Sequence, residues 1–298
     1  MEVQICILGS AAGGGLPQWN CGCPNCRRAR AGEIPARTQS SVAVSLDGDD
    51  WALVNASPDI GRQLIDTPSL HPKSLRHTPI AAVLVTNGDI DHTAGLLTLR
   101  EKQPFALMAT AELHTVLDAN PIFDALDRSL VSRVPVAAGT PFKILPGLEA
   151  EIFSVPGKVP LYLEGETVET DLEGEFTVGI EFRTAGKRAC YIPGCAAMTL
   201  RLAERLKGAD AVLFDGTLWD DDEMIATGLG KKTGRRMGHM PVSGEGGSIE
   251  AFEEFGIPTR VYVHINNSNP IADPASAEAA KARAAGWTVG EDGMVITP

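Results

Sequence analysis

Ten short apolar runs, each of six or seven residues and bounded by turn-forming residues, constrain the fold more than any other feature of this sequence. Runs of this length and composition predict β-strands. Five segments between and after them place apolar residues three and four positions apart, which predicts helices. The predicted strands are 3–9, 40–46, 51–56, 80–86, 105–110, 149–155, 176–182, 189–194, 211–216 and 260–266. The predicted helices are 93–102, 111–119, 198–209, 245–256 and 276–286.

This mixture of strands and helices predicts an α/β fold. Because no linker or internal repeat divides the 298 residues, we expect one domain spanning 1–298. We expect two mixed sheets packed face to face, with helices on their outer faces. The acidic segment 161–178 has no clear helical face, and we interpret it as a hairpin or lid insertion rather than a domain boundary.

The charge of the chain restricts its partners. A formal net charge of −12 and a pI near 5.0 argue against nonspecific binding to nucleic acid or to an anionic membrane, since both require a basic face. A small molecule is therefore the expected partner. No apolar run approaches the roughly 20 residues that cross a bilayer. The N-terminal residues lack a basic leader followed by an apolar core, so we expect a cytoplasmic protein without membrane insertion.

Three cysteines, Cys21, Cys23 and Cys26, lie within six residues in "CGCPNC". Three thiolates this close together can reach one tetrahedral ion, and Pro24 is suited to begin a short helix that holds the third. The alternative is three reduced thiols without a metal. We favour a structural zinc knuckle at 21–26, which stabilises the fold rather than taking part in catalysis and requires a fourth ligand from elsewhere.

A second group of polar residues follows the predicted strand 80–86, where "TNGDIDH" contains Asp89, Asp91 and His92. By itself this loop fits a metal site and a helix N-cap equally well, with Asp91 or Thr93 as the capping residue in the second case. The predicted strand 260–266 contains His264 near its end, in the same kind of position. Two histidines and one carboxylate match the ligand set of non-haem iron, which favours the metal site.

Several segments resemble known proteins. "TNGDIDH" resembles the T-H-x-H-x-D-H loop of the metallo-β-lactamase superfamily, and "CGCPNC" resembles the zinc knuckle of its phosphodiesterase branch. Within the superfamily, "GSAAGGGLPQWNCGCPNC", "YIPGCA", "GHMPVSG" and "HINNSNPI" resemble the family that acts in biosynthesis of pyrroloquinoline quinone (PQQ). The resemblance covers essentially the whole chain. It implies the αββα sandwich, two mixed sheets between outer layers of helices.

The sequence departs from the superfamily pattern at four metal positions. The first two histidines of the motif correspond to Asn87 and Asp89. A third has no counterpart, since Gly157 and Lys158 occupy its neighbourhood, and Gly194 and Cys195 stand where the bridging aspartate is expected. Hydrolysis by a metal-bridged hydroxide is therefore not expected.

The remaining positions of the motif are Asp91, His92 and His264. A single site with these three ligands suits Fe(II) and O₂ more than a binuclear hydrolase. Asp89 is expected to act in catalysis, as an extra ligand or as a base that orients a histidine, and Asn87 is expected to contact the ligands without binding the metal.

The resemblance also implies a reaction and a substrate. We expect an iron- and O₂-dependent hydroxylase acting on the tyrosine ring of the crosslinked glutamate–tyrosine precursor of PQQ. The alternative is a carrier that assists transfer of PQQ or its precursor toward the periplasm. A carrier requires no redox metal. The implied partners are the small-molecule precursor and other PQQ biosynthesis proteins.

The loop 230–241 is basic and contains Lys231, Lys232, Arg235, Arg236 and His239. Arginine and lysine are suited to the carboxylates of such a substrate. The charge of this segment alone is equally consistent with a solvent-exposed loop that binds no substrate. The resemblance places His239 at the general-acid position of the phosphodiesterase branch, which favours an active-site loop and a catalytic histidine.

The resemblance assigns two further positions. The fourth zinc ligand of the knuckle corresponds to Asn267, and Asp215 ends the strand 211–216 at the rim of the metal site without binding the metal. His71, His77 and His114 have no ligand partner nearby in the sequence, and we expect surface or capping roles for them.

Overall fold

Two seven-stranded mixed sheets form the centre of the computed structural model, which describes every residue except 1, 166–168, 171 and 185. The first sheet has the order β14-β1-β2-β3-β4-β5-β6 and is antiparallel from β14 to β3 and parallel from β3 to β6. Its strands are β1 (Gln4–Gly9), β2 (Ser41–Ser45), β3 (Trp51–Val54), β4 (Ile80–Leu84), β5 (Phe105–Ala109), β6 (Val131–Pro135) and β14 (Val295–Ile296).

The second sheet has the order β13-β12-β11-β10-β9-β8-β7 and is parallel from β13 to β10 and antiparallel from β10 to β7. Its strands are β7 (Phe142–Leu145), β8 (Leu148–Gly157), β9 (Leu172–Thr184), β10 (Lys187–Ile192), β11 (Ala211–Asp215), β12 (Thr259–Val263) and β13 (Thr288–Val289). Because β8 and β9 pair antiparallel, the segment 161–178 belongs to a hairpin connection, as predicted, apart from its residues outside the described ones.

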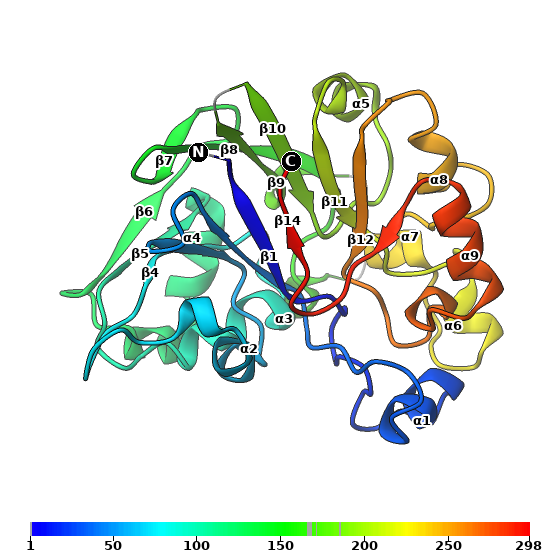
Figure 1. The fold of residues 1–298 in the computed structure, drawn as a ribbon, viewed down its shortest axis with the longest axis horizontal. Helices are drawn as coiled ribbons and strands as arrows, with labels where there is room; N and C mark the ends of the chain where they lie inside the picture. Colours follow the sequence, from blue (N-terminus) through cyan, green and yellow to red (C-terminus); the bar gives the residue numbers. More distant parts are fainter. Residues whose placement is uncertain (1, 166–168, 171, 185) are drawn as a thin grey trace.

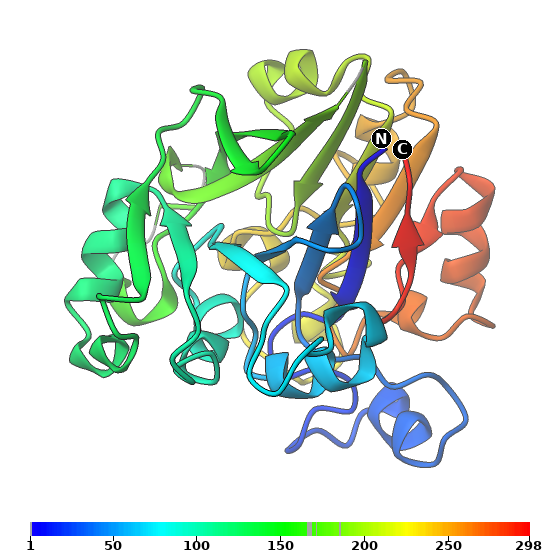
Figure 2. The same cartoon turned by 60° about the vertical axis from the view of Figure 1, so that its left-hand side comes forward.

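Helices cover the outer faces of both sheets (Figures 1 and 2). The α-helices of the described residues are α1 (Pro24–Arg30), α2 (Ile60–Asp66), α3 (Ile90–Thr93), α4 (Ala111–Asp118), α5 (Leu200–Leu206), α6 (Glu223–Ala226), α7 (Gly234–Met237), α8 (Ser248–Ala251) and α9 (Ala277–Ala284). Figure 1 shows α1 projecting from the body formed by the sheets. Among the described residues, no helix combines the length and the apolar character that crossing a bilayer requires.

Three clusters of buried side chains account for the layers. One contains inward-facing residues of both sheets, such as Val44 and Phe182, and therefore lies between them. The second joins the outer face of the second sheet to its helices and contains Trp287, stacked on Tyr262 with ring centroids 4.0 Å apart. The third packs α2 and α4 on the first sheet. The predicted αββα sandwich is confirmed, since burial on both faces of each sheet requires the outer helices.

All five predicted helices contain helical residues, but two are much shorter than predicted. The predicted helix 93–102 contains only the last residue of α3 and a 3₁₀ helix, Ala94–Leu97, and 245–256 contains only the four residues of α8. In the first case, the Gly95 amide donates to Ala56 O at 2.8 Å, and a Cβ on Gly95 would lie 2.0 Å from Ser57 O. The Gly95 amide thus bonds to the segment that follows β3, so a tertiary hydrogen bond takes the place of a regular helical one.

Candidate metal centre and adjoining cavity

The structure brings Asp91, His92 and His264 together at the ends of parallel strands. Asp91 and His92 lie on α3, after β4, and His264 directly follows β12. Asp91 Oδ2 is 3.2 Å from His264 Nε2 and 3.6 Å from His92 Nε2. One potential ligand atom from each residue lies within 4.8 Å of the other two. Strands far apart in the sequence thus bring these three side chains to one point.

A threonine hydroxyl orients each of the two imidazoles. Thr86 Oγ1 donates to Asn55 Oδ1 at 3.1 Å, so at 3.2 Å it accepts from His92 Nδ1. This arrangement places the proton of the imidazole on Nδ1 and leaves the lone pair of His92 Nε2 facing Asp91.

The second imidazole is held in the same way. Thr217 Oγ1 donates to Asp215 Oδ1 at 2.6 Å and accepts from His264 Nδ1 at 2.8 Å. His264 Nε2 faces Asp91 Oδ2 at 3.2 Å and donates to this carboxylate, and a bound ion would take the place of that proton. With an ion bound, two imidazole nitrogens and one carboxylate oxygen would form a three-point face, a ligand set that fits a divalent metal ion.

Electrostatics favour the metal-binding protonation states of Asp91 and His92. For His264, burial would lower the pKa, but the hydrogen bond and the charge of Asp91 raise it above its ordinary value. Burial alone would raise the pKa of Asp91, but the charge of His92 and the hydrogen bond to His264 hold it well below its usual range. Burial lowers the pKa of His92 to about 4. The centre thus combines an ionised carboxylate with a neutral imidazole.

The backbone at His264 supports a functional role. Its φ of 55° lies in the left-handed region, which residues other than glycine rarely adopt. Such conformations cost free energy and are retained where the surrounding structure requires them. At His264 the conformation directs the imidazole to Asp91.

Asp215 and His239 form a second pair beside the centre. Asp215 Oδ2 accepts from Cys195 N at 2.9 Å and from His239 Nδ1 at 2.7 Å, while Oδ1 accepts from Thr217. Asp215, His239 and His264 also lie close enough to form a ligand group. Because both oxygens of Asp215 already have donors, we assign Asp215 to orienting Thr217 and His239 instead. Asp215 ends β11 beside the centre, and its role without metal binding stays a prediction.

A cavity of about 510 Å³ adjoins the three ligands. Asp89 and Asn87 line it, with Asp89 N donating to Asn87 Oδ1 at 2.9 Å and Leu161 N donating to Asp89 Oδ1 at 2.9 Å. Asp89 is therefore in the cavity wall and outside the three-residue ligand group. Ala12 and Gly13, which follow β1, also line the cavity, and a Cβ on Gly13 would lie 3.4 Å from Asp91 Oδ2.

Only some of the residues of the basic loop 230–241 that were predicted to bind substrate lie at the cavity. Lys232 and His239 line the cavity, and Arg236 lies next to Glu164, another lining residue. In contrast, Lys231 is exposed and is not a lining residue. Arg235 also lies outside the lining because its guanidinium donates to Gly246 O at 3.1 Å.

Sequence reasoning missed two charged residues of the cavity, Lys158 and Glu164. The carboxylate of Glu164 forms ion pairs with three cations, since Lys158, Lys232 and Arg236 lie within 4 Å of it. Partial burial would raise the pKa of Glu164, but the contacts with Lys158 and Lys232 lower it below its ordinary value. The one available signal was Lys158, which stands near the missing superfamily histidine.

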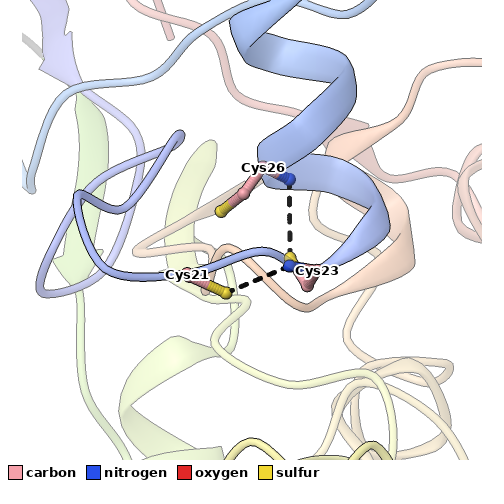
Figure 3. Close-up of side chains that lie close together, drawn as sticks. All are labelled: Cys21, Cys23 and Cys26. Atoms are coloured by element: carbon pink, nitrogen blue, oxygen red, sulfur yellow. Dashed lines mark hydrogen bonds between the residues drawn. The ribbon is translucent and has the colours of Figure 1, made fainter.

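The cysteine knuckle is a separate group at the start of α1 (Figure 3). The three sulfurs of Cys21, Cys23 and Cys26 converge, and Asn267 Nδ2 lies 3.2, 3.5 and 3.3 Å from them, respectively. Tetrahedral zinc bonds of about 2.3 Å to sulfur and 2.1 Å to oxygen place these ligand atoms about 3.6 Å apart. Rotation of the amide exchanges its nitrogen and oxygen. Asn267 thus lies where a fourth ligand is required.

One expectation about histidines is wrong. His114, for which we expected a surface or capping role, is buried on α4, where it shares a helix face with Leu117. Its imidazole packs in the layer between α4 and the first sheet. His71 is exposed and His77 half-buried, as expected for residues outside a site.

The comparisons with known proteins agree with this geometry. Residues 50–265 match the family model described as the beta-lactamase superfamily domain. The chain is 54% identical over 297 residues to coenzyme PQQ synthesis protein B of Rhizobium meliloti, covering 99% of this chain and 98% of the relative. It is 56% identical over 294 residues to the protein of the same name from Ruegeria pomeroyi, with 99% of each covered.

The chain belongs to the PQQ synthesis protein B family of the beta-lactamase superfamily. The crystal structure of Zn²⁺-bound PqqB from Methylobacterium extorquens has a TM-score of 0.97 and 52% identity, covering 99% of this chain and 100% of that one. A diphosphatase of the PhnP family, at 20% identity and a TM-score of 0.69, shares the fold. The zinc in the PqqB structure supports a metal-binding role for this family.

The hydroxyl of Thr217 provides a direct test of the metal centre. In Thr217→Val, the imidazole of His264 loses its acceptor at nearly constant side-chain volume. We expect the affinity of the centre for Fe(II) or Zn²⁺ to fall roughly 10- to 100-fold, as for other residues that orient ligands. Competition with a chelator measures this affinity without turnover. Thr217→Ser should restore most of it, and a valine variant that binds metal like the wild type would contradict the assignment.

Proposed function

We propose that this chain acts in PQQ biosynthesis as an Fe(II)- and O₂-dependent hydroxylase of the tyrosine ring in the crosslinked glutamate–tyrosine precursor. The family membership supports the biosynthetic role. The observation that carries the chemistry is the three-point face of Asp91, His92 and His264 beside a cavity with a basic wall. Three protein ligands leave further positions of an iron ion open for O₂ and substrate.

Asp91, His92 and His264 would hold the iron, and bound Fe(II) supplies activation of O₂ for insertion of one oxygen atom into an aromatic C–H bond. His239 lines the cavity and directs Nδ1 to Asp215, so its Nε2 is available to exchange a proton with the ring hydroxyl. The Asp89 carboxylate orients the cavity wall through the Leu161 amide. Lys232 and Arg236 bind substrate carboxylates.

Oxygen uptake by anaerobically purified protein tests the proposal. The protein is loaded with Fe(II) or with Zn²⁺, and the crosslinked diamino acid is added with O₂ and ascorbate as the source of two electrons. We expect uptake and a product enlarged by one oxygen atom only in the iron-loaded sample. Binding without uptake in either sample would favour the carrier, which requires the cavity and its cations but no redox metal.

Arg236→Ala is expected to weaken binding of the crosslinked diamino acid by about three- to tenfold, because a partly exposed ion pair contributes roughly 1 kcal/mol. The loss should shrink as salt concentration rises. Titration calorimetry at two ionic strengths measures both effects. Arg235→Ala is the matched control, since its guanidinium contacts Gly246 rather than the cavity. Equal effects of the two variants would indicate only a general contribution of the basic loop.

A further inference from the structure

Glu164 occupies a cluster of three cations in the wall of the cavity. Its Oε1 is 2.9 Å from Lys158 Nζ, and its Oε2 is 3.2 Å from Lys232 Nζ and 3.7 Å from Arg236 Nη1. The side chain of Glu164 is only 9% exposed. The three cations come from two separate parts of the chain, the end of β8 and the loop containing α7. The carboxylate of Glu164 thus partners a cluster that carries more positive charge than one carboxylate neutralises.

The segment Leu161–Glu164 is held to the cavity mainly by polar contacts. Leu161 N donates to Asp89 Oδ1, and the Tyr162 hydroxyl donates to Gly88 O at 2.8 Å. The side chains of Leu161, Tyr162 and Leu163 are 59%, 46% and 48% exposed, so little apolar burial fixes this segment. Contacts of this kind can be exchanged at small free-energy cost, because each is worth about 1 kcal/mol.

We propose that Lys158, Lys232 and Arg236 form a carboxylate subsite that Glu164 occupies in the free protein and that a carboxylate of the ligand takes over. The cluster with Glu164 bound carries a net charge of +2, counted as three cations and one anion, and therefore still attracts an anion. An incoming carboxylate replaces Glu164 with the same chemical group. A neutral ligand that displaced Glu164 would break its ion pairs without forming new ones. The subsite is therefore selective for anions.

The identity of the physiological ligand rests on the proposed function. Binding to the subsite itself can be tested without turnover. Glutarate serves as the probe because it is a small dicarboxylate, and its dimethyl ester is the uncharged control. Glu164→Gln removes the internal competitor and keeps the size of the side chain. Glu204→Gln is the matched control variant, since Glu204 is exposed and pairs with Lys207 on α5.

Titration calorimetry should show that Glu164→Gln binds glutarate about five- to tenfold more tightly than the wild type, with no change for the dimethyl ester or for Glu204→Gln. Lys158→Met should weaken glutarate binding by a similar factor. In the double variant, the gain from Glu164→Gln should become smaller, because the two residues act through one cluster.

Unchanged or weaker glutarate binding by Glu164→Gln would overturn the inference, and so would a gain that is equally large with and without Lys158→Met. Hydroxylation is measured separately. If Glu164→Gln binds glutarate more tightly while the iron-loaded protein takes up no oxygen, the subsite stands and the proposed hydroxylase fails. If oxygen uptake is normal and the glutarate response is absent, the reverse conclusion follows.

Discussion

The variants His264→Ala and His92→Ala are each expected to lose the metal of the active centre and to lower hydroxylation about 1,000-fold or more, which corresponds to about 4 kcal/mol. Each substitution removes one of only three protein ligands and leaves Asp91 as a buried carboxylate with a single imidazole partner. Metal analysis of the purified variants, together with oxygen uptake, measures both effects. Metal at the cysteine knuckle should remain, because the two groups share no residue.

Two controls make this result specific. His71→Ala removes an exposed histidine and should leave metal content and uptake unchanged. Asn87→Ala should keep the metal and alter the rate only modestly, since Asn87 Oδ1 accepts from the Asp89 amide rather than contacting the ligand atoms. Full hydroxylation by His264→Ala, or hydroxylation by wild type with zinc alone under iron-free conditions, would refute the mononuclear iron centre.

The second large effect concerns stability. Cys23→Ser is expected to release the metal of the knuckle and to lower the free energy of unfolding by roughly 3 kcal/mol or more, because metal binding to such a site contributes directly to folding. Cys23 also accepts a hydrogen bond from the Cys26 amide as the N-cap of α1. Zinc content and thermal unfolding of the variant measure the effect. The rate of hydroxylation per folded molecule should change much less than stability.

Cys6→Ser is the control for the knuckle variant. Cys6 is a buried cysteine on β1 and does not belong to the three-cysteine group, so its substitution should leave the metal content unchanged. Asn267→Ala should weaken zinc retention without abolishing it, because three thiolates remain. A wild type that is fully folded without zinc would contradict a structural role for the knuckle.

Much of the fold was predictable because its strands are buried on both faces. The apolar run at Val42–Val44, for example, is completely buried in β2, and such runs stand out in a sequence. The missed strands are different. β13 and β14 contain two residues each, and β6 and β7 have several exposed or half-buried positions without regular alternation, so neither length nor periodicity distinguishes the four strands from loops.

The sequence by itself determined which residues can bind a metal. Asp91, His92 and the three cysteines of the knuckle are recognisable locally, because their ligand types lie within a few residues of one another. His264 was recognisable as the end of a buried strand. These assignments depend on residue chemistry and short spacing, and both are present in the linear chain.

Only the tertiary structure decided which polar residues surround those ligands and which cations face the cavity. Thr86 and Thr217 orient the two imidazoles, yet nothing in their local sequence distinguishes them from other threonines. Likewise, Lys232 reaches the cavity and meets Glu164 from another part of the chain, while the adjacent Lys231 does not reach the cavity. The physical reason is that side-chain direction and long-range contacts depend on how the two sheets pack, which local spacing does not specify.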